Sequence, residues 1–407
     1  MIERSTESAL VREPSAELDV RPILDAVRAH GDAALRDYAQ HFGDPPPREI
    51  PRAEIAAAYD QTSGALRKAL AGAAERIERF ARAQRNALAA VTIREGNLEL
   101  GHRLIPVERA GIYVPAGRHP LPSSLLMGAI PARVAGVRER IVCTPRAGRE
   151  VLAAAHVTGV EHVFEIGGAQ AVAALAFGTQ SVPRVDLIVG PGNAYVTAAK
   201  RAVFGVCGID ALAGPSEIAI IASSDADADL VAADLLAQAE HDDDARALLI
   251  TDDRAFARAV EARVEGRLAK LETAATARRS LERRGGFILL ALDDAPAFCN
   301  RLAPEHLSLQ GARAEALAPS CTTYGTLFIG AGAAEVFGDY GSGPNHVLPT
   351  NGTARFSSGL SVMNFVTLRT YERAIGKCDR RIADDAAILA RAEGLAAHRD
   401  AALARLS

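Results

Sequence analysis

The segment Val185-Asp186-Leu187-Ile188-Val189-Gly190-Pro191-Gly192-Asn193-Ala194-Tyr195 carries the pattern that decides the fold. Its apolar run, residues 185–189, is typical of a buried strand, and the residues from 194 to 203 are typical of a helix. Gly190 and Gly192 form the turn between them. A strand followed by a short turn and a helix is the repeating unit of a parallel sheet, because the helix carries the chain back to the start of the next strand.

The same unit recurs on both sides of this segment. Strands are predicted at residues 111–114, 140–144, 162–166 and 218–221. Helices are predicted between them at residues 122–134, with an interruption at Pro131, and at residues 149–156 and 169–176. This alternation predicts one doubly wound domain over residues 104–222, with right-handed crossovers.

A second set of elements follows, and it predicts a second α/β domain over residues 223–350. A helix leading to His241 comes first, and a long charged helical stretch is expected at residues 254–281. The strands of this set are predicted at residues 247–251, 286–290 and 326–329.

The two ends of the chain differ from this middle part. Residues 17–95 have the apolar spacing of helices. We expect residues 1–103 to form a helical segment that packs with residues 223–350. The first dozen residues have no clear pattern and are expected to be an arm or a disordered tail. Residues 351–407 form a tail that ends in a helix from 383 to 406. The predicted fold is therefore α/β, with two doubly wound (Rossmann-like) domains, a helical N-terminal segment and a helical C-terminal tail.

Composition excludes several functions. The chain has 407 residues, of which 24% are charged, and its net charge is −4. It has no basic run with interleaved aromatic residues, so we expect no nucleic-acid partner. No stretch approaches the roughly 18 apolar residues of a membrane helix, and no apolar segment follows the first charged residues, so we expect a cytoplasmic protein without membrane contact. The five cysteines form no C-x-x-C pair, which argues against a disulfide framework or a thiolate zinc site.

Three glycine-bearing turns follow predicted strands of the first domain. They are Tyr113-Val114-Pro115-Ala116-Gly117, Gly167-Gly168-Ala169-Gln170 and Gly190-Pro191-Gly192-Asn193-Ala194-Tyr195. Such turns at the carboxyl ends of parallel strands are where open α/β sheets bind nucleotides. The last turn departs from the G-x-G-x-x-G fingerprint because Tyr195 stands in its final position. A dinucleotide site and ordinary strand-to-helix turns therefore both remain open.

Candidate metal ligands begin in Leu235-Leu236-Ala237-Gln238-Ala239-Glu240-His241-Asp242. On a helix Gln238 and His241 point to one side, whereas Glu240 points to water. A buried amide needs a partner or a cation, because burying it unpaired costs about 1–3 kcal/mol. A loop rich in Gly and Pro, residues 337–349, adds further polar side chains, and loops of this kind often bind ligands.

Four of these polar residues together would make a mixed nitrogen and oxygen site that suits Zn²⁺. They are Gln238, His241, Asp339 and His398. For each residue taken singly, a hydrogen-bonded structural role is the alternative.

Several motifs, in order along the chain, resemble those of the histidinol dehydrogenase family from about residue 20 onward. They are Gly190-Pro191-Gly192-Asn193, Ala213-Gly214-Pro215-Ser216-Glu217, Gln238-Ala239-Glu240-His241, Glu305-His306, Gly338-Asp339-Tyr340 and Asn345-His346-Val347-Leu348-Pro349-Thr350. The resemblance implies a zinc- and NAD-dependent enzyme that oxidises the amino alcohol L-histidinol through its aldehyde, histidinal, to L-histidine. This reaction uses two NAD⁺ and ends histidine biosynthesis.

The resemblance also implies a role for each matched residue. The metal ligands would be Gln238, His241, Asp339 and His398. The NAD contacts would be Tyr113, Gln170 and Asn193. The substrate contacts would be Ser216, Gln238, His241, His306, Asp339, His346, Glu393 and His398. The acid/base pair would be Glu305 and His306.

In the family that the motifs resemble, zinc holds the imidazole and the amine of the substrate as a positioning template. His306 would remove the hydroxyl proton, and Glu305 would activate the water that adds to the aldehyde. The resemblance further implies a homodimer whose C-terminal tails are exchanged, so that His398 reaches the active site of the other subunit.

Departures from the family pattern keep alternatives open. Ala116 stands where a second glycine is usual, Asn364 stands where an aspartate is usual, and residues 363–375 match less well. A relative that oxidises a different amino or hydroxy alcohol is therefore the first alternative. A non-catalytic zinc- or nucleotide-binding homologue would not need both Glu305 and His306, and a zinc hydrolase would leave the glycine turns unexplained.

Overall fold

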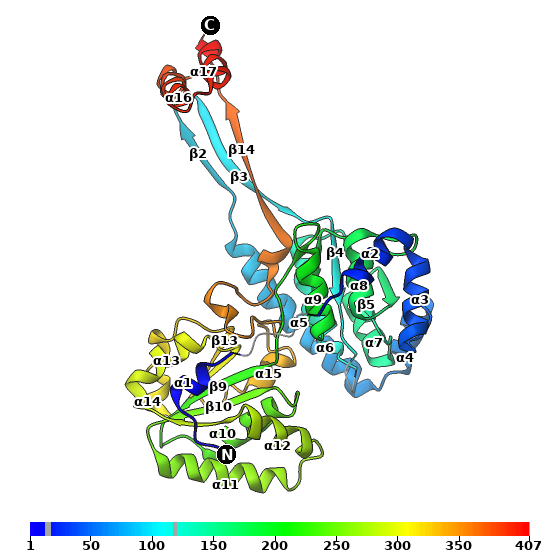
Figure 1. Cartoon of the computed structure of the whole chain (residues 1–407), viewed down its shortest axis with the longest axis vertical. Coiled ribbons are helices and arrows are strands. Elements are labelled where there is room, and N and C mark those ends of the chain that lie inside the picture. Colours follow the sequence, from blue (N-terminus) through cyan, green and yellow to red (C-terminus); the bar gives the residue numbers. More distant parts are fainter. Residues whose placement is uncertain (13–17, 117–119, 407) are drawn as a thin grey trace.

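A computed structural model describes residues 1–12, 18–116 and 120–406 as a mixed α/β protein. Two bodies, each built on a parallel sheet, lie side by side, and a long arm projects away from them (Figure 1). The N-terminus lies on the second body, and the C-terminus lies at the tip of the arm. In the described ranges, the helices are all too short or too polar to cross a membrane.

The first sheet confirms the predicted alternation of strands and helices. Its strand order is β1-β6-β5-β4-β7-β8, and the strands from β4 to β8 pair in parallel, whereas β1 pairs antiparallel with β6. The chain starts at β4 in the middle, builds outward to β6 and then returns to add β7 and β8 on the other side, which is the doubly wound arrangement. The strands are β1 (Arg48–Glu49), β4 (Arg109–Tyr113), β5 (Glu139–Thr144), β6 (His162–Glu165), β7 (Leu187–Val189) and β8 (Gly208–Ile209).

Helices from two parts of the chain cover this sheet. Those that connect its strands are α6 (Pro122–Ala135), α7 (Arg149–Thr158), α8 (Gly168–Phe177) and α9 (Ala194–Val203). Those that precede β4 are α2 (Arg21–His30), α3 (Asp32–Phe42), α4 (Arg52–Gln61) and α5 (Gly64–Ala87).

Most of the N-terminal helices pack on the first domain and not, as predicted, with residues 223–350; α5 also contacts that region, because Nε of Arg76 donates to the Gly341 carbonyl oxygen at 2.7 Å. Helix α2 packs on α8, α4 packs on α7, and α5 packs on α6, so these helices complete the first domain. Their apolar faces explain this choice: Leu24 and Val27 enter the same core as Phe164, whereas Ile55 and Ile77 join the core beneath α6.

The predicted interruption at Pro131 is also wrong, because α6 runs unbroken through it. A proline inside a helix leaves the carbonyl four residues earlier without its donor. Here that carbonyl belongs to Met127, and the side-chain amide of Asn345 donates to it at 2.8 Å. The Asn345 side chain therefore replaces the hydrogen bond that the proline removes.

The second sheet has the order β11-β10-β9-β12-β13, and its strands pair in parallel. Its strands are β9 (Glu217–Ala222), β10 (Arg246–Thr251), β11 (Gly286–Leu289), β12 (His306–Gln310) and β13 (Thr326–Ile329). We predicted the strand at residues 218–221 as part of the first domain, and this prediction is wrong. The strand is β9, which lies at the centre of the second sheet and is hydrogen-bonded to β10 and β12. The boundary between the domains therefore lies before residue 217.

Short helices surround the second sheet. The long stretch predicted at residues 254–281 is two helices, α11 and α12. The helices of this domain are α10 (Ala228–Ala239), α11 (Arg254–Leu268), α12 (Ala274–Arg283), α13 (Ala295–Leu302), α14 (Ala312–Glu315) and α15 (Glu335–Asp339), with 3₁₀ turns η1 (Leu292–Asp294) and η2 (Ala318–Ser320).

The first residues of the chain are ordered against the second domain, so the expectation of an arm or disordered tail is wrong for residues 1–12. Glu3 forms a bridge with Phe287, and helix α1 (Thr6–Leu10) places Ala9 in the core. The buried guanidinium of Arg246 donates to the carbonyl oxygens of Ala9 at 2.8 Å and Val11 at 3.0 Å, and these bonds anchor the segment. Residues 13–17 lie outside the described residues.

The arm is a three-stranded antiparallel sheet that carries two helices at its tip (Figure 1). Its elements are β2 (Val91–Glu95), β3 (Leu98–Pro106), β14 (Val366–Ala374), α16 (Arg380–Ala392), α17 (Ala396–Leu403) and η5 (Ala404–Leu406). The helical tail was predicted, whereas β2 had been taken as helix. Apolar side chains of the arm stay exposed, among them Ile93, Leu368, Ile388 and Leu389.

The segment between the second domain and the arm returns to the first domain. It contains the turns η3 (Thr353–Arg355) and η4 (Val362–Phe365), and Phe365 is buried in the core beneath α6. Asn364 accepts hydrogen bonds from the backbone and hydroxyl of Ser361 and so caps η4. An aspartate oxygen could accept the same two bonds, so this departure from the family pattern leaves the cap in place.

Candidate active site

A short connection between the two sheets determines where the site lies. Residues 210–216 link the carboxyl end of β8 to the amino end of β9. The hydroxyl of Thr197 donates to the Ala213 carbonyl at 3.0 Å, and the Gly214 N–H donates to the Thr350 hydroxyl at 2.6 Å, so both domains hold this connection. The carboxyl edge of the first sheet and the amino edge of the second are thereby brought together.

Glu305 and His306 lie at the amino end of β12 and are both buried. The Glu305 carboxylate accepts a hydrogen bond from the Glu217 N–H at 2.9 Å. The Nδ1 atom of His306 lies 3.2 Å from the Glu217 carbonyl oxygen and 3.2 Å from Oε1 of Gln238. Because both of these neighbours are acceptors, Nδ1 carries the proton in the neutral ring, and Nε2 is left free to accept one.

Burial controls the charge of this pair. It lowers the pKa of His306 to about 4, against the opposing effect of Asp339, so the ring is neutral at pH 7. Burial also raises the pKa of Glu305 well above its usual value, although hydrogen bonds from Glu217 and Ser216 oppose the rise.

The residues predicted to bind metal lie beside this pair, except for His398. Gln238 is fully buried in the last turn of α10, and His241 lies just beyond that helix. The Nδ1 atom of His241 lies 2.9 Å from the Ala237 carbonyl oxygen, and its Nε2 lies 3.8 Å from Oδ2 of Asp339. Glu240 is exposed, as predicted from the helical spacing.

Two predicted substrate contacts also lie in this cluster. Nδ1 of His346 lies 2.9 Å from the carbonyl oxygen of Asp339, which fixes the ring on the loop that follows α15. Ser216 directly precedes β9 and lies near enough to Glu305 to oppose the rise in its pKa. The structure therefore brings together residues from the ends of α10 and α15 and from the starts of β9 and β12.

Glu393 and His398 lie far from this cluster within one chain. Glu393 ends α16 and His398 belongs to α17, and both helices are at the tip of the arm (Figure 1). Within residues 1–12, 18–116 and 120–406, no three His, Cys, Asp or Glu side chains are grouped so that they could hold a metal ion. His398, one of the four predicted ligands, belongs to α17 and is separated from the other three.

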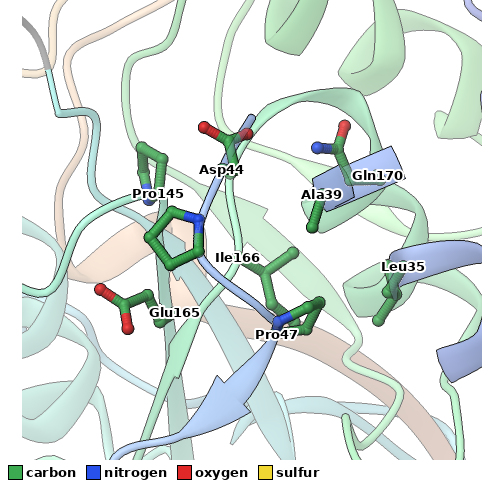
Figure 2. Close-up of a pocket in the computed structure, with 10 residues that line it drawn as sticks. Leu35, Ala39, Asp44, Pro47, Pro145, Glu165, Ile166 and Gln170 are labelled. Atoms are coloured by element: carbon green, nitrogen blue, oxygen red, sulfur yellow. The ribbon is translucent and has the colours of Figure 1, made fainter. Parts of the chain in front are cut away.

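The predicted cofactor residues line the carboxyl edge of the first sheet. Tyr113 is buried at the end of β4, and its hydroxyl accepts from the Gly168 N–H at 3.1 Å. Asn193 caps α9 by accepting from the Val196 N–H at 3.1 Å. Gln170 lines a small pocket together with Asp44, as Figure 2 shows.

These turns flank the point where the strand order reverses, between β4 and β7, which is where open α/β sheets bind ligands. Gly117, which was predicted to end the first turn, lies outside the described residues.

Sequence reasoning missed two buried carboxylates of the site. Glu335 begins α15, and its Oε1 lies 3.7 Å from Nδ1 of His306; neither of its oxygens has a hydrogen-bond partner in the described part of the chain. Burial and the nearby Asp339 raise the pKa of Glu335 well above its usual value. The available signal was its spacing, because Glu335 stands four residues before Asp339 and so faces the same side of a helix.

The second missed carboxylate is Glu217, whose backbone contacts both Glu305 and His306. Its side chain pairs with Arg12, which also donates to the Leu302 carbonyl at 2.6 Å. The N-terminal segment is thus tied to the strand that supports the acid/base pair.

Comparison with known proteins agrees with this arrangement. The family model for histidinol dehydrogenase matches residues 7–406. A histidinol dehydrogenase from Methylococcus capsulatus is 48% identical over 93% of this chain and 89% of its own length. One from Thermus thermophilus is 46% identical over 97% of this chain and 96% of its own length.

A solved structure gives the same result at the level of the fold. The crystal structure of histidinol dehydrogenase from Elizabethkingia anophelis has a TM-score of 0.93 and 34% identity, and the match covers 98% of this chain and 95% of that one. The chain belongs to the histidinol dehydrogenase family and is an oxidoreductase enzyme.

Proposed function

We propose that this chain is a cytoplasmic, zinc-dependent enzyme that oxidises L-histidinol to L-histidine through histidinal, with NAD⁺ as the oxidant, in the last step of histidine biosynthesis. The observation that carries the proposal is the buried pair Glu305 and His306 beside the polar cluster of Gln238, His241 and Asp339. An acid/base pair next to candidate metal ligands, in a chain that also has nucleotide-type glycine turns, suits a metal-assisted dehydrogenase better than a binding protein.

The cluster fits a zinc ion. Zinc lies about 2.0–2.2 Å from nitrogen and oxygen ligands, so two ligands of one ion are at most about 4.4 Å apart. Nε2 of His241 and Oδ2 of Asp339, 3.8 Å apart, satisfy this limit. Gln238 would supply a third ligand through its amide oxygen, because Oε1 has two lone pairs and, in the described ranges, only the contact with Nδ1 of His306 uses one. When bound, the metal would supply a positive charge that holds the imidazole and amine of the substrate.

The residues of the chain supply the proton transfers. The free Nε2 of His306 would take the hydroxyl proton of the alcohol as the first oxidation proceeds. The carboxyl of Glu305, held by the Glu217 N–H, would orient and deprotonate the water that adds to the aldehyde. Ser216 and His346 would hold the polar groups of the substrate.

Cofactor binding is assigned to Tyr113, Gln170 and Asn193, at the switch point of the first sheet. Bound NAD⁺ would accept a hydride in each of the two oxidation steps. The turn beside these residues requires glycine at position 190, because its φ of +111° and the nearby Tyr113 carbonyl leave no room for a side chain.

We also infer a homodimer that shares its active sites. His398 and Glu393, proposed as a zinc ligand and a substrate contact, are at the tip of an arm that points away from their own site (Figure 1). The arm exposes Ile93, Leu368, Ile388 and Leu389, and a second copy of the chain would cover them. The partner's tail would then complete the site.

Absorbance of NADH tests the proposal directly. With L-histidinol as the substrate, we expect two NADH per molecule oxidised, loss of activity on chelation and recovery with Zn²⁺. Turnover of another amino or hydroxy alcohol, with none of histidinol, would favour the first alternative. Binding of zinc and NAD⁺ without turnover would favour a non-catalytic homologue, and hydrolysis that needs no NAD⁺ would favour a zinc hydrolase.

A further inference from the structure

A buried ion pair lies directly behind the Gly190 turn. Lys200 belongs to α9 and Asp210 follows β8, and each side chain is only 3% exposed. The ammonium of Lys200 and the carboxylate of Asp210 form a salt bridge. None of the motifs used to identify the site includes Lys200 or Asp210.

The pair holds both backbone polar groups of Gly190. Oδ2 of Asp210 accepts from the Gly190 N–H at 2.7 Å, and Nζ of Lys200 donates to the Gly190 carbonyl at 3.0 Å. Gly190 has a φ of +111° and turns the chain from β7 toward Asn193. The conformation of the turn is therefore set by two side chains of opposite charge.

The same pair also contacts the connection between the two sheets, residues 210–216. Oδ1 of Asp210 accepts from the Ala211 N–H at 2.6 Å, at the start of the connection that ends at Ser216. The hydroxyl of Thr197, on α9 as Lys200 is, donates to Ala213 in that connection. Lys200 and Asp210 thus join the cofactor turn to the loop that carries a substrate contact.

We infer that Lys200 and Asp210 are positioning residues that fix the Gly190 turn for the binding of a dinucleotide. The inference rests on the proposed use of NAD⁺. A buried ion pair is on its own weak evidence for stability, because desolvation of the two charges offsets their attraction. Charged hydrogen bonds to both polar groups of one glycine are, by contrast, well suited to hold a backbone in place.

The test compares Lys200→Met and Asp210→Asn with the wild-type enzyme. We expect the KM for NAD⁺, and the Kd for NADH measured by fluorescence, to rise about tenfold or more, because small displacements of positioning groups have large effects. The KM for histidinol and the zinc content should change much less. Asp210→Asn keeps the size of the side chain, so this variant alone can test the positioning role if Lys200→Met does not fold.

Arg140→Met is the matched control. Arg140 is a buried cation of the same domain, paired with Glu161 near the amino end of β5, on the edge away from the glycine turns. Its loss should lower the melting temperature without changing the KM for NAD⁺.

If the Lys200 and Asp210 variants behave like Arg140→Met, with KM for NAD⁺ within about twofold of the wild-type value, the positioning role is overturned. A wild-type enzyme that neither binds nor reduces NAD⁺ would instead overturn the proposed function, and the role inferred here with it.

Discussion

His306 is the residue on which the proposed proton transfer depends. Its Nδ1 faces two acceptors, the Glu217 carbonyl and Gln238, so its Nε2 is the atom available to a substrate. His306→Asn would lose this base and keep most of the volume of the ring. We expect turnover to fall about 10²- to 10⁴-fold, as for the loss of a general base, with zinc content unchanged.

Steady-state NADH production and metal analysis check this result. His156→Asn is the control, because His156 is exposed on α7 and stacks on Tyr59 away from the site, so its replacement should leave turnover unchanged. A His306→Asn enzyme that works at the wild-type rate would remove the base role.

Alanine variants at Gly190 and Gly205 distinguish the effect of backbone strain from the effect of moving the proposed cofactor turn. Both have positive φ, +111° and +103°, so alanine strains either position. A Cβ at Gly190 would lie 2.2 Å from the Tyr113 carbonyl oxygen, whereas a Cβ at Gly205 would meet nothing within 4 Å. Both variants should lose stability, by about 1–3 kcal/mol from strain.

Only Gly190→Ala should also raise the KM for NAD⁺, because only there must the turn move. Thermal unfolding and NAD⁺ titration of both variants measure the two effects. An equal change in KM for both would mean that the turn has no special part in cofactor binding.

At the scale of elements, alternation along the chain revealed most strands and helices but not their partners. The strand at residues 218–221 was found, yet the pattern cannot say that it pairs with β10 and β12 instead of β7. Strand β12 was missed because His306, Ser308 and Gln310 make one of its faces polar. The continuity of α6 depends on Asn345, which is far away in the sequence.

The candidate site was predictable in part for the same reason. Turns at the carboxyl ends of strands indicated the sheet edge that is proposed to bind the cofactor, and family motifs supplied the ligand candidates. The placement of Glu305 and His306 at the amino ends of strands follows from the connection at residues 210–216, which no local pattern describes. Glu335 belongs to no quoted motif, and its spacing of four residues from Asp339 was the only sequence signal for it; its position beside His306 comes from the structure.

The salt bridge between Arg12 of the N-terminal segment and Glu217 of β9 leads to a prediction about how these two elements support each other. Arg12→Ala removes the partner of the buried Glu217 carboxylate. We expect a loss of about 1–3 kcal/mol in the free energy of unfolding, because a buried acceptor is left unpaired. A lower turnover should accompany it, since Glu217 supports both Glu305 and His306.

Chemical denaturation and the NADH assay measure these changes. Arg21→Ala serves as the control, because Arg21 pairs with Asp19 on the surface and its loss should not shift the unfolding midpoint. If the Arg12→Ala protein is as stable as the Arg21→Ala protein, the Arg12–Glu217 salt bridge contributes nothing to the free energy of unfolding.

At the scale of the whole molecule, the arm separates residues that the proposed chemistry needs together. His398 belongs to α17 at its tip (Figure 1), whereas Gln238, His241 and Asp339 lie at or just beyond the ends of α10 and α15 in the second domain. In the proposed dimer, the tail of a second copy would supply the His398 ligand. The exposed apolar side chains of the arm are consistent with such a contact.

The claim that two chains complete one active site is tested most directly by mixing two inactive variants, His398→Ala and His306→Asn, under conditions that allow subunit exchange. In a mixed dimer, one site would combine the intact His306 of the His398→Ala chain with the intact His398 of the His306→Asn chain. Half of the dimers would be mixed, each with one working site of two, so activity should return to about one quarter of the wild-type value. If exchange is verified and no activity returns, the tail does not act on the partner's site.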